Sequence, residues 1–392
     1  MGGEAASAAS GNGSSSAKSG IVLDSRLLGV VAVAVLFIIS LYLWTLPFQK
    51  NRLPFGEGDA AWHFAIGDHI SSSDKATFRL PYYVGVWYFG YNRILGAFAP
   101  EYPPPNHVNY ALVQIFGGER FVPFMIYRAF ASFLGAFAVF FLVSRLFGVL
   151  PGFLAGLGLS FSIREQLTSL FGQQPTLTSL VITPVTTYAW YAYLTSFYDA
   201  HAAGGINAGS SQKGGRKIYL YLTFALLASQ YLLHIQGFVT SSVIMVVITI
   251  AMAVKFRKLP VSRSNIKNFA VAAVMLAIVA APFFAIYFGT PDTQSTGFSF
   301  SLPRLLQWGI SPESVQGSFP AAFVQFSAEY GRILVPFLFA GIALLILRLL
   351  LVRNNSREIL LLSWLIGTYI ILHLDVFTGA SVPRLARMLV IE

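Results

Sequence analysis

Long apolar runs dominate the chain, and shorter polar stretches separate them. The first run, "LLGVVAVAVLFIISLYLWTL" at 27–46, contains no charged residue. About 20 apolar residues cross a bilayer as an α-helix, in which every backbone hydrogen bond is satisfied internally. The pattern predicts an all-α polytopic membrane protein with about nine transmembrane helices, at 27–46, 122–144, 146–162, 177–197, 218–235, 238–254, 268–288, 333–351 and 359–376.

The segment before the first run differs in character. Residues 1–20, "MGGEAASAASGNGSSSAKSG", are small, polar and of low complexity, which predicts a disordered tail. The run that follows is too long for the hydrophobic region of a signal peptide, so we interpret it as a retained transmembrane helix. The chain therefore divides into a tail at 1–20 and a transmembrane domain at 21–392.

Two connections between the predicted spans are long, at 47–120 and 289–332. The first holds "YYVGVWYFGY" at 82–91, and such aromatic clusters are typical of a membrane interface. We expect short amphipathic helices that lie on the outer leaflet here, rather than a separate soluble domain.

Composition and charge add the orientation. Of 392 residues 55% are hydrophobic and 11% charged, with a net charge of +10 and Cys 0. Basic residues gather in the loops 199–217, 255–267 and 348–357, which places these loops and the N-terminus in the cytoplasm and the long first loop outside. The excess charge follows from this topology and does not indicate nucleic-acid binding. The absence of cysteine excludes disulfides and thiolate chemistry.

The stretch "FGEGDAAWHFAIGDH" at 55–69 places ionisable groups just outside the first run. Asp59 precedes a helical pattern, so it either caps a helix or acts as a base, with Glu57 beside it. His63 lies four residues further on the same helix face. Asp59 and His63 suit a divalent metal or a proton relay, and equally a local hydrogen bond.

The stretch "PEYPPPNHVNY" at 100–110 carries Glu101 and His107. Its consecutive prolines predict an extended segment that cannot be helical. Such a segment is either a rigid connection back into the membrane or a stiff wall that presents polar groups to a ligand.

The stretch "SIREQLTSLFGQQPTLTSLVITP" at 162–184 begins at the outer end of the third predicted span. Arg164 and the start of the next helix, after Gln173 and Gln174, form a candidate phosphate site. An interfacial salt pair of Arg164 with Glu165 is the structural alternative.

Three further arginines are functional candidates. Arg128 lies inside the second predicted span, where a charge is a functional candidate, although its head group can also reach the interface by snorkelling. Arg384 and Arg387 lie outside near the chain end and could hold a second anionic group. We expect Arg164, Arg384 and Arg387 to share one phosphate-sized pocket.

These motifs together resemble the GT-C superfamily of membrane glycosyltransferases, which use polyprenyl-linked sugar donors. The likeness rests on one charge-poor span, a long outer loop that opens with "GEGDAAWHF", and the proline-rich "EYPPPNHVNYAL". The segment "SIREQLTSLFGQQPTLTSLVITPV" resembles the second outer loop of oligosaccharyltransferase catalytic subunits and of YfhO-like membrane proteins. The resemblance covers roughly residues 27–260 and the arginines near the end.

The resemblance implies transfer of a sugar from a polyprenyl-phosphate donor to a glycan, lipid or protein acceptor at the outer membrane face. The reaction would be a direct inverting displacement, with Asp59 as general base and Glu57 or His63 orienting it or assisting Mg or Mn. The phosphate leaving group would be stabilised by arginines. The expected substrate-binding residues are Glu101, His107, Arg164, Gln173, Gln174, Arg384 and Arg387.

Two other function classes stay open. Oligosaccharyltransferases carry an acidic metal-binding triplet in the second loop, whereas this chain has Gln173 and Gln174 near that place. The absence of this acidic triplet and the short length of the chain favour a non-catalytic GT-C-like subunit or a truncated product. A transporter or flippase for lipid-linked sugars is the other alternative, and it predicts charged or broken spans near the midplane.

Overall fold

The computed structural model describes residues 25–49, 59–72, 105–117, 121–162, 169, 172–202, 210–261, 263–288, 334–352 and 356–372. Every regular element in these ranges is a helix, which confirms the all-α prediction. One short 3₁₀ helix, η1 (Gln114–Phe116), follows α4. The α-helices are α1 (Ser25–Gln49), α2 (Asp59–Ser72), α4 (Pro105–Val113), α5 (Phe121–Phe147), α6 (Val149–Ser160), α8 (Gln174–Leu180), α9 (Thr183–Ala202), α10 (Ser210–Leu233), α11 (Ile235–Phe256), α12 (Arg263–Phe288), α15 (Leu334–Leu351) and α16 (Ser356–Leu372).

Three of the described helices are long and apolar enough to cross a membrane. They cover Arg26–Leu46 in α1, Phe121–Phe147 in α5 and Ile235–Phe256 in α11. These helices coincide with the first, second and sixth predicted spans, so helices long and apolar enough for a membrane span form at these places. Shorter apolar stretches lie in other helices, at Val149–Ser160, Lys217–Leu233, Asn265–Ala281 and Pro336–Leu351.

Two predicted spans differ from single long helices. Gly148, with a φ of 100°, separates α5 from α6, and the 12 residues of α6 rise only about 18 Å, less than the roughly 30 Å of a hydrocarbon core. The run predicted at 177–197 is divided between α8 and α9. Pro184 stands in the first turn of α9, and its ring would clash with the carbonyl of Leu180, the last residue of α8, in a continuous helix.

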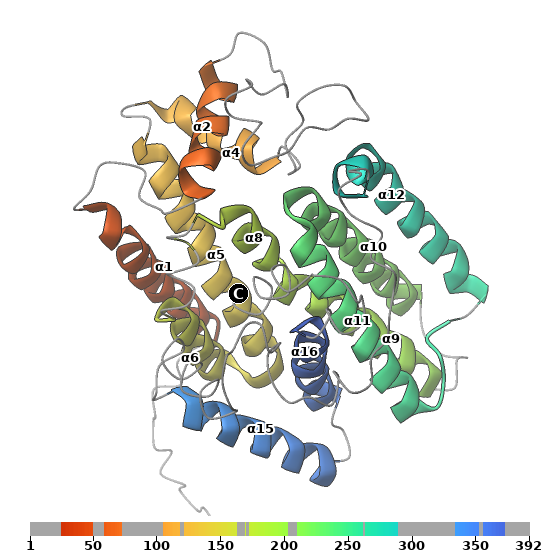
Figure 1. The fold of residues 1–392 in the computed structure, drawn as a ribbon. Coiled ribbons are helices and arrows are strands. Elements are labelled where there is room, and N and C mark those ends of the chain that lie inside the picture. The colour runs from red at the N-terminus through yellow and green to blue at the C-terminus, as the bar shows by residue number, and fades with distance from the viewer. Residues whose placement is uncertain are drawn as a thin grey trace, which may run out of the picture.

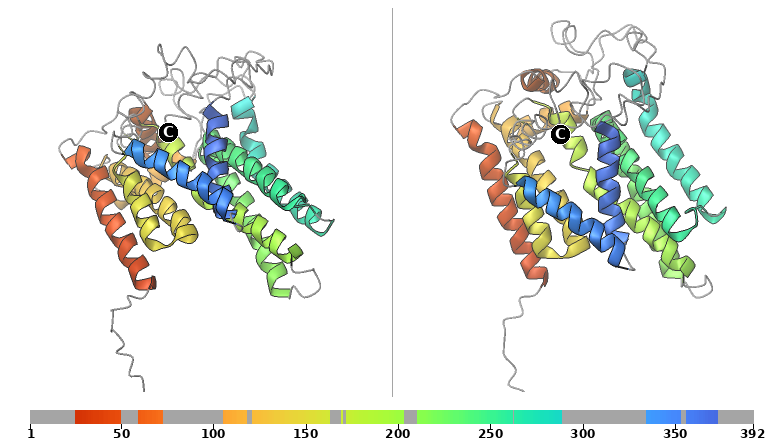
Figure 2. Two further views of the ribbon diagram at one scale, coloured as in Figure 1. Left: turned by 90° about the horizontal axis from the view of Figure 1, so that it is seen from below. Right: turned by 60° about the horizontal axis from the view of Figure 1, so that its bottom comes forward.

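The helices form two groups (Figure 1), and α8 joins them because it packs on α5 as well as on α10 and α11. In the first group α1, α5 and α6 pack on one another, and in the second α9, α10 and α11 pack together with α12 against α10. Among the described residues, the largest cluster of buried apolar side chains includes Tyr193 and Ile244 of the second group, Leu146 of α5 and Leu360 of α16. Because Leu360 belongs to α16, this helix is part of the core. By contrast, α15 is exposed along most of its length and lies obliquely to α16 (Figure 2).

Basic residues gather where several helix ends meet. Arg357 Nη1 donates to the Leu146 carbonyl at 2.7 Å, and the Tyr198 hydroxyl donates to the Lys258 carbonyl at 2.8 Å. Arg348 Nε pairs with Glu358 Oε1 at 2.7 Å. These contacts join the ends of α5 and α15 to the start of α16, and the end of α9 to the end of α11. We call this end the basic face, and its described basic residues include Arg26, Arg145, Lys255, Arg257, Lys258, Arg348 and Arg357.

Candidate functional site

The helices α2 and α4 lie together over the start of α5, at the end opposite the basic face (Figure 1). A side chain at Gly67 would meet Tyr110 Cβ at 2.6 Å, so the glycine lets α2 approach α4 closely. Tyr110 packs edge-on against Phe124 of α5 with ring centroids 4.8 Å apart. The start of α2 at Asp59 agrees with the predicted helix start. We call this region the α2–α4 end.

The extended segment predicted at 100–110 is wrong in its second half. The helix α4 begins at Pro105, the third of the consecutive prolines. Proline is favoured at the first helical position, because its fixed φ suits a helix and its missing N–H has no intrahelical partner there. Asn106 and His107 therefore lie on a helix rather than on a stiff extended wall.

His63 and His107 form a buried pair. His63 Nδ1 lies 2.9 Å from His107 Nε2, so one ring donates the single hydrogen of the bond to the other. Burial lowers the pKa of His107 to about 3. Burial also holds the pKa of His63 well below its usual range, and the charges of His107, His234 and Arg128 lower it further. Both imidazoles are therefore neutral at pH 7. Because an added proton is disfavoured on either ring, the pair can pass a proton on only by giving one up as it takes one.

Arg128 lies beneath this pair and is fully buried, with 0% of its side chain exposed. Its Nε donates to Gln174 Oε1 and its Nη2 donates to Ser169 Oγ, both at 3.4 Å. The guanidinium carbon also lies 5.5 Å from the centre of the Phe124 ring. The snorkelling interpretation is therefore wrong, because the head group points into the protein. A buried charge of this kind is a functional candidate.

Gly172 brings the glutamine segment against α2. It has a φ of +83°, and an added Cβ would lie 2.0 Å from Ala60 N and 2.5 Å from Ala60 Cα. Only glycine fits this approach, which sets Gln173 and Gln174 beside the first turn of α2. Gln174 is buried, and its Nε2 has no hydrogen-bond partner among the described residues.

The junction of α10 and α11 contributes residues that sequence reasoning missed. His234 caps α11, with its Nδ1 accepting from the Gln236 N–H at 3.3 Å. Ser179 of α8 donates to the His234 carbonyl at 2.8 Å, and Thr178 donates to Asn106 Oδ1 at 3.0 Å. The signal in the sequence was a histidine at the end of the apolar run 218–235, just before the run 238–254.

The remaining predicted site residues are not placed. Glu57, Glu101, Arg164, Arg384 and Arg387 lie outside the described residues, so their convergence on one phosphate pocket stays a prediction. The backbone of Asp59 is described and its side chain is not. Within the described ranges, no group of three or more histidine, cysteine or acidic side chains is arranged to hold a metal ion.

Comparisons with known proteins add no constraint. No protein-family model, no curated protein and no solved structure matches the chain. The geometry of the α2–α4 end is therefore the basis for assigning a function.

Proposed function

We propose that this protein is a GT-C-like membrane glycosyltransferase that moves a sugar from a polyprenyl-phosphate donor to an acceptor at the outer membrane face. One observation carries the proposal. Three separate motifs, represented by His63, His107 and Gln174, meet at one end of the helices around a buried arginine. Polar groups from distant segments that converge beside a membrane boundary are the expected form of a site for a lipid-linked substrate.

The proposed topology has about nine spans, with the basic face in the cytoplasm and the α2–α4 end outside. The support for this orientation is the basic residues at the ends of α5, α11 and α15, which the positive-inside pattern assigns to the cytoplasm. The N-terminus is then cytoplasmic and the first long loop lies outside.

In the proposed mechanism the acceptor hydroxyl attacks the anomeric carbon while the bond from that carbon to the phosphate oxygen breaks. Asp59, at the start of α2, takes the hydroxyl proton. The neutral pair of His63 and His107 orients the base or passes the proton onward. Arg128 supplies a fixed positive charge beneath the site that favours the departing phosphate, together with the arginines expected in the loops.

The test is sugar transfer by the purified protein in proteoliposomes. A panel of radiolabelled polyprenyl-phosphate sugars is supplied with total membrane lipid and glycan as acceptors, and products are separated by chromatography and mass spectrometry. Asp59→Asn should lower transfer by about 10²-fold or more, the range of general-base catalysis, with unchanged thermal stability. Asn caps a helix about as well as Asp, so a pure cap would leave transfer intact.

A matched control separates the site from general effects on α2. His63→Asn should lower transfer, whereas His69→Asn removes the same chemical group from the same helix and should leave transfer near normal. Failure of the wild-type protein to transfer any sugar of the panel would refute the proposed function.

A lipid-linked sugar flippase is the second candidate, and one observation favours it. The run predicted as a single span is discontinuous at Val181–Ile182, between α8 and α9, and discontinuous helices are common at transporter binding sites. The same proteoliposomes distinguish the two functions. A flippase moves the labelled donor across the bilayer and forms no new glycoside.

A further inference from the structure

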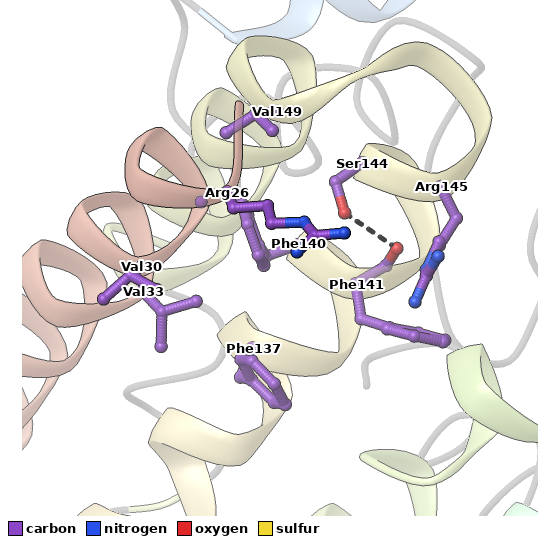
Figure 3. A pocket seen from close by; sticks show the side chains of 10 residues that line it. Arg26, Val30, Val33, Phe137, Phe140, Phe141, Ser144, Arg145 and Val149 are labelled. Carbon is purple, nitrogen blue, oxygen red and sulfur yellow. Dashed lines mark hydrogen bonds between the residues drawn. The ribbon is translucent and has the colours of Figure 1, made fainter. Parts of the chain in front are cut away.

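A groove of about 540 Å³ lies between the start of α1, the last turns of α5 and the start of α6 (Figure 3). Its walls are mainly apolar, with Val30 and Val33 from α1 and Phe137 and Phe140 from α5. Arg26 and Arg145 line the same groove. It is separate from the α2–α4 end, because it lies along the opposite end of α5.

Charge and apolar surface are separated along this groove. Arg145 stands in the last turn of α5, beside Leu146, whose carbonyl accepts from Arg357 on the basic face. Val33 lies seven residues after Arg26 and Phe137 eight residues before Arg145, so the apolar walls extend about 10–12 Å along the helices from the charged rim. One leaflet of the hydrocarbon core is about 15 Å deep. The groove therefore matches most of the depth of one leaflet.

The rim is built for an anion. The guanidinium carbon of Arg145 lies 5.6 Å from the centre of the Phe141 ring, a cation–π contact that holds the charge at the groove. The Ser144 hydroxyl donates to the Phe141 carbonyl at 3.0 Å, so its hydrogen is already used. Anion recognition therefore falls to Arg26 and Arg145, whose planar donor groups fit phosphate oxygens.

We propose that this groove binds one anionic phospholipid of the leaflet at the basic face. Its phosphate lies between Arg26 and Arg145, and one acyl chain follows Val30, Val33 and Phe137. An apolar groove between membrane helices with basic residues at its cytoplasmic end is the expected form of such a site. A zwitterionic headgroup brings a cationic group toward two arginines, whereas an anionic headgroup does not. The proposal does not depend on glycosyl transfer.

The glycine at position 29 allows a steric test. Gly29 lines the groove, and an added Cβ there would meet nothing within 4 Å. Leucine is also a better helix former than glycine. Gly29→Leu should therefore fold normally, keep both arginines and fill the space that the acyl chain needs.

The experiment uses the full-length protein, delipidated in detergent. Phosphatidylglycerol and phosphatidylcholine with identical acyl chains are titrated separately, and binding is measured by native mass spectrometry and by the rise in Tm. Phosphatidylglycerol should bind the wild-type protein at least about tenfold more tightly than it binds Arg26→Gln/Arg145→Gln, because two charged hydrogen-bonding groups are lost. Gly29→Leu should also weaken binding.

The control is Arg257→Gln/Lys258→Gln, which removes the same charge from the basic face away from the groove and should bind phosphatidylglycerol as the wild type does. Equal binding of phosphatidylcholine, or an equal rise in Tm with inorganic phosphate alone, would overturn the proposal. Unchanged binding by Gly29→Leu would show that no acyl chain lies in the groove, and would overturn it as well.

Discussion

Replacement of Gly172 by alanine tests how the glutamine segment is held against α2. Gly172 has a φ of +83° and Gly117 has a φ of +82°, values that residues with a Cβ rarely adopt, so alanine is strained at both positions. The surroundings differ. An added Cβ at Gly117 would meet nothing within 4 Å, whereas at Gly172 it would lie 2.0 Å from Ala60 N.

The expected losses follow from these contacts. Gly117 has a ψ of 179°, and an alanine held in such a sparsely populated region costs about 1–3 kcal/mol, which is the whole loss of unfolding free energy expected for Gly117→Ala. Ordinary contacts begin at 3.4 Å, so the start of α2 must move by about 1.4 Å in Gly172→Ala, the difference between 3.4 Å and 2.0 Å. Overpacking of this kind costs about 1–3 kcal/mol more. The gain from restricting the unfolded chain is the same in both variants and cancels.

The assay is denaturant unfolding of the purified variants in detergent, followed by tryptophan fluorescence. Gly172→Ala should lose about 2–6 kcal/mol of unfolding free energy, against about 1–3 kcal/mol for Gly117→Ala. Adding Ala60→Gly to Gly172→Ala should restore little, because the backbone nitrogen and Cα of residue 60 make the closest contacts. Equal losses in the two alanine variants would refute the close approach of Gly172 to α2.

Three further predictions concern pH, the basic face and orientation. Tm should fall as the pH is lowered from about 7.5 to about 5. His107 has a pKa of about 3 in the folded protein and takes up a proton only on unfolding, so the stability present above about pH 6.5 is lost on acidification. In thermal scans, His107→Gln should show a smaller fall in Tm over the same pH range. Arg348→Gln should lower the free energy of unfolding more than Glu358→Gln does, by up to about 3 kcal/mol in denaturant titrations. The reason is that Arg348→Gln leaves the carboxylate of Glu358, which is 1% exposed, without this partner, whereas Arg348 is 57% exposed and can turn to water when Glu358 is replaced. In intact cells an impermeant thiol reagent should label Ser72→Cys and not Lys258→Cys, since the chain has no native cysteine; the reverse pattern would invert the proposed topology.

The spans illustrate which structural features the sequence could predict. Residues 27–46 and 238–254 form long helices as predicted, because an uninterrupted apolar run satisfies its backbone only as a helix in lipid. The run at 177–197 was apolar enough for the same prediction, yet it is broken before Pro184. The apolar composition of a segment predicts that it can lie in the membrane. Whether the segment is one continuous helix depends on the backbone carbonyl that the proline ring would clash with.

The residues of the candidate site could likewise be predicted from the sequence, whereas their contacts could not. The sequence identified His63, His107 and Gln174 as polar groups in an apolar chain, because ionisable and amide groups beside membrane spans are costly without a use. It could not show that His63 and His107 share one hydrogen bond across 44 residues, nor that His234 belongs with them. Those pairings depend on close helix contacts at Gly67 and Gly172, which only the tertiary structure fixes.

Arg128 shows the physical reason most directly. Its position in the sequence placed a charge within an apolar helix and left two outcomes, a head group that reaches the interface or one that is buried. The choice depends on whether neighbouring helices supply oxygen acceptors at the right depth. Gln174 and Ser169 supply them from segments more than 40 residues away, so the packing of α5 against α8, and not the local sequence, turned the head group inward.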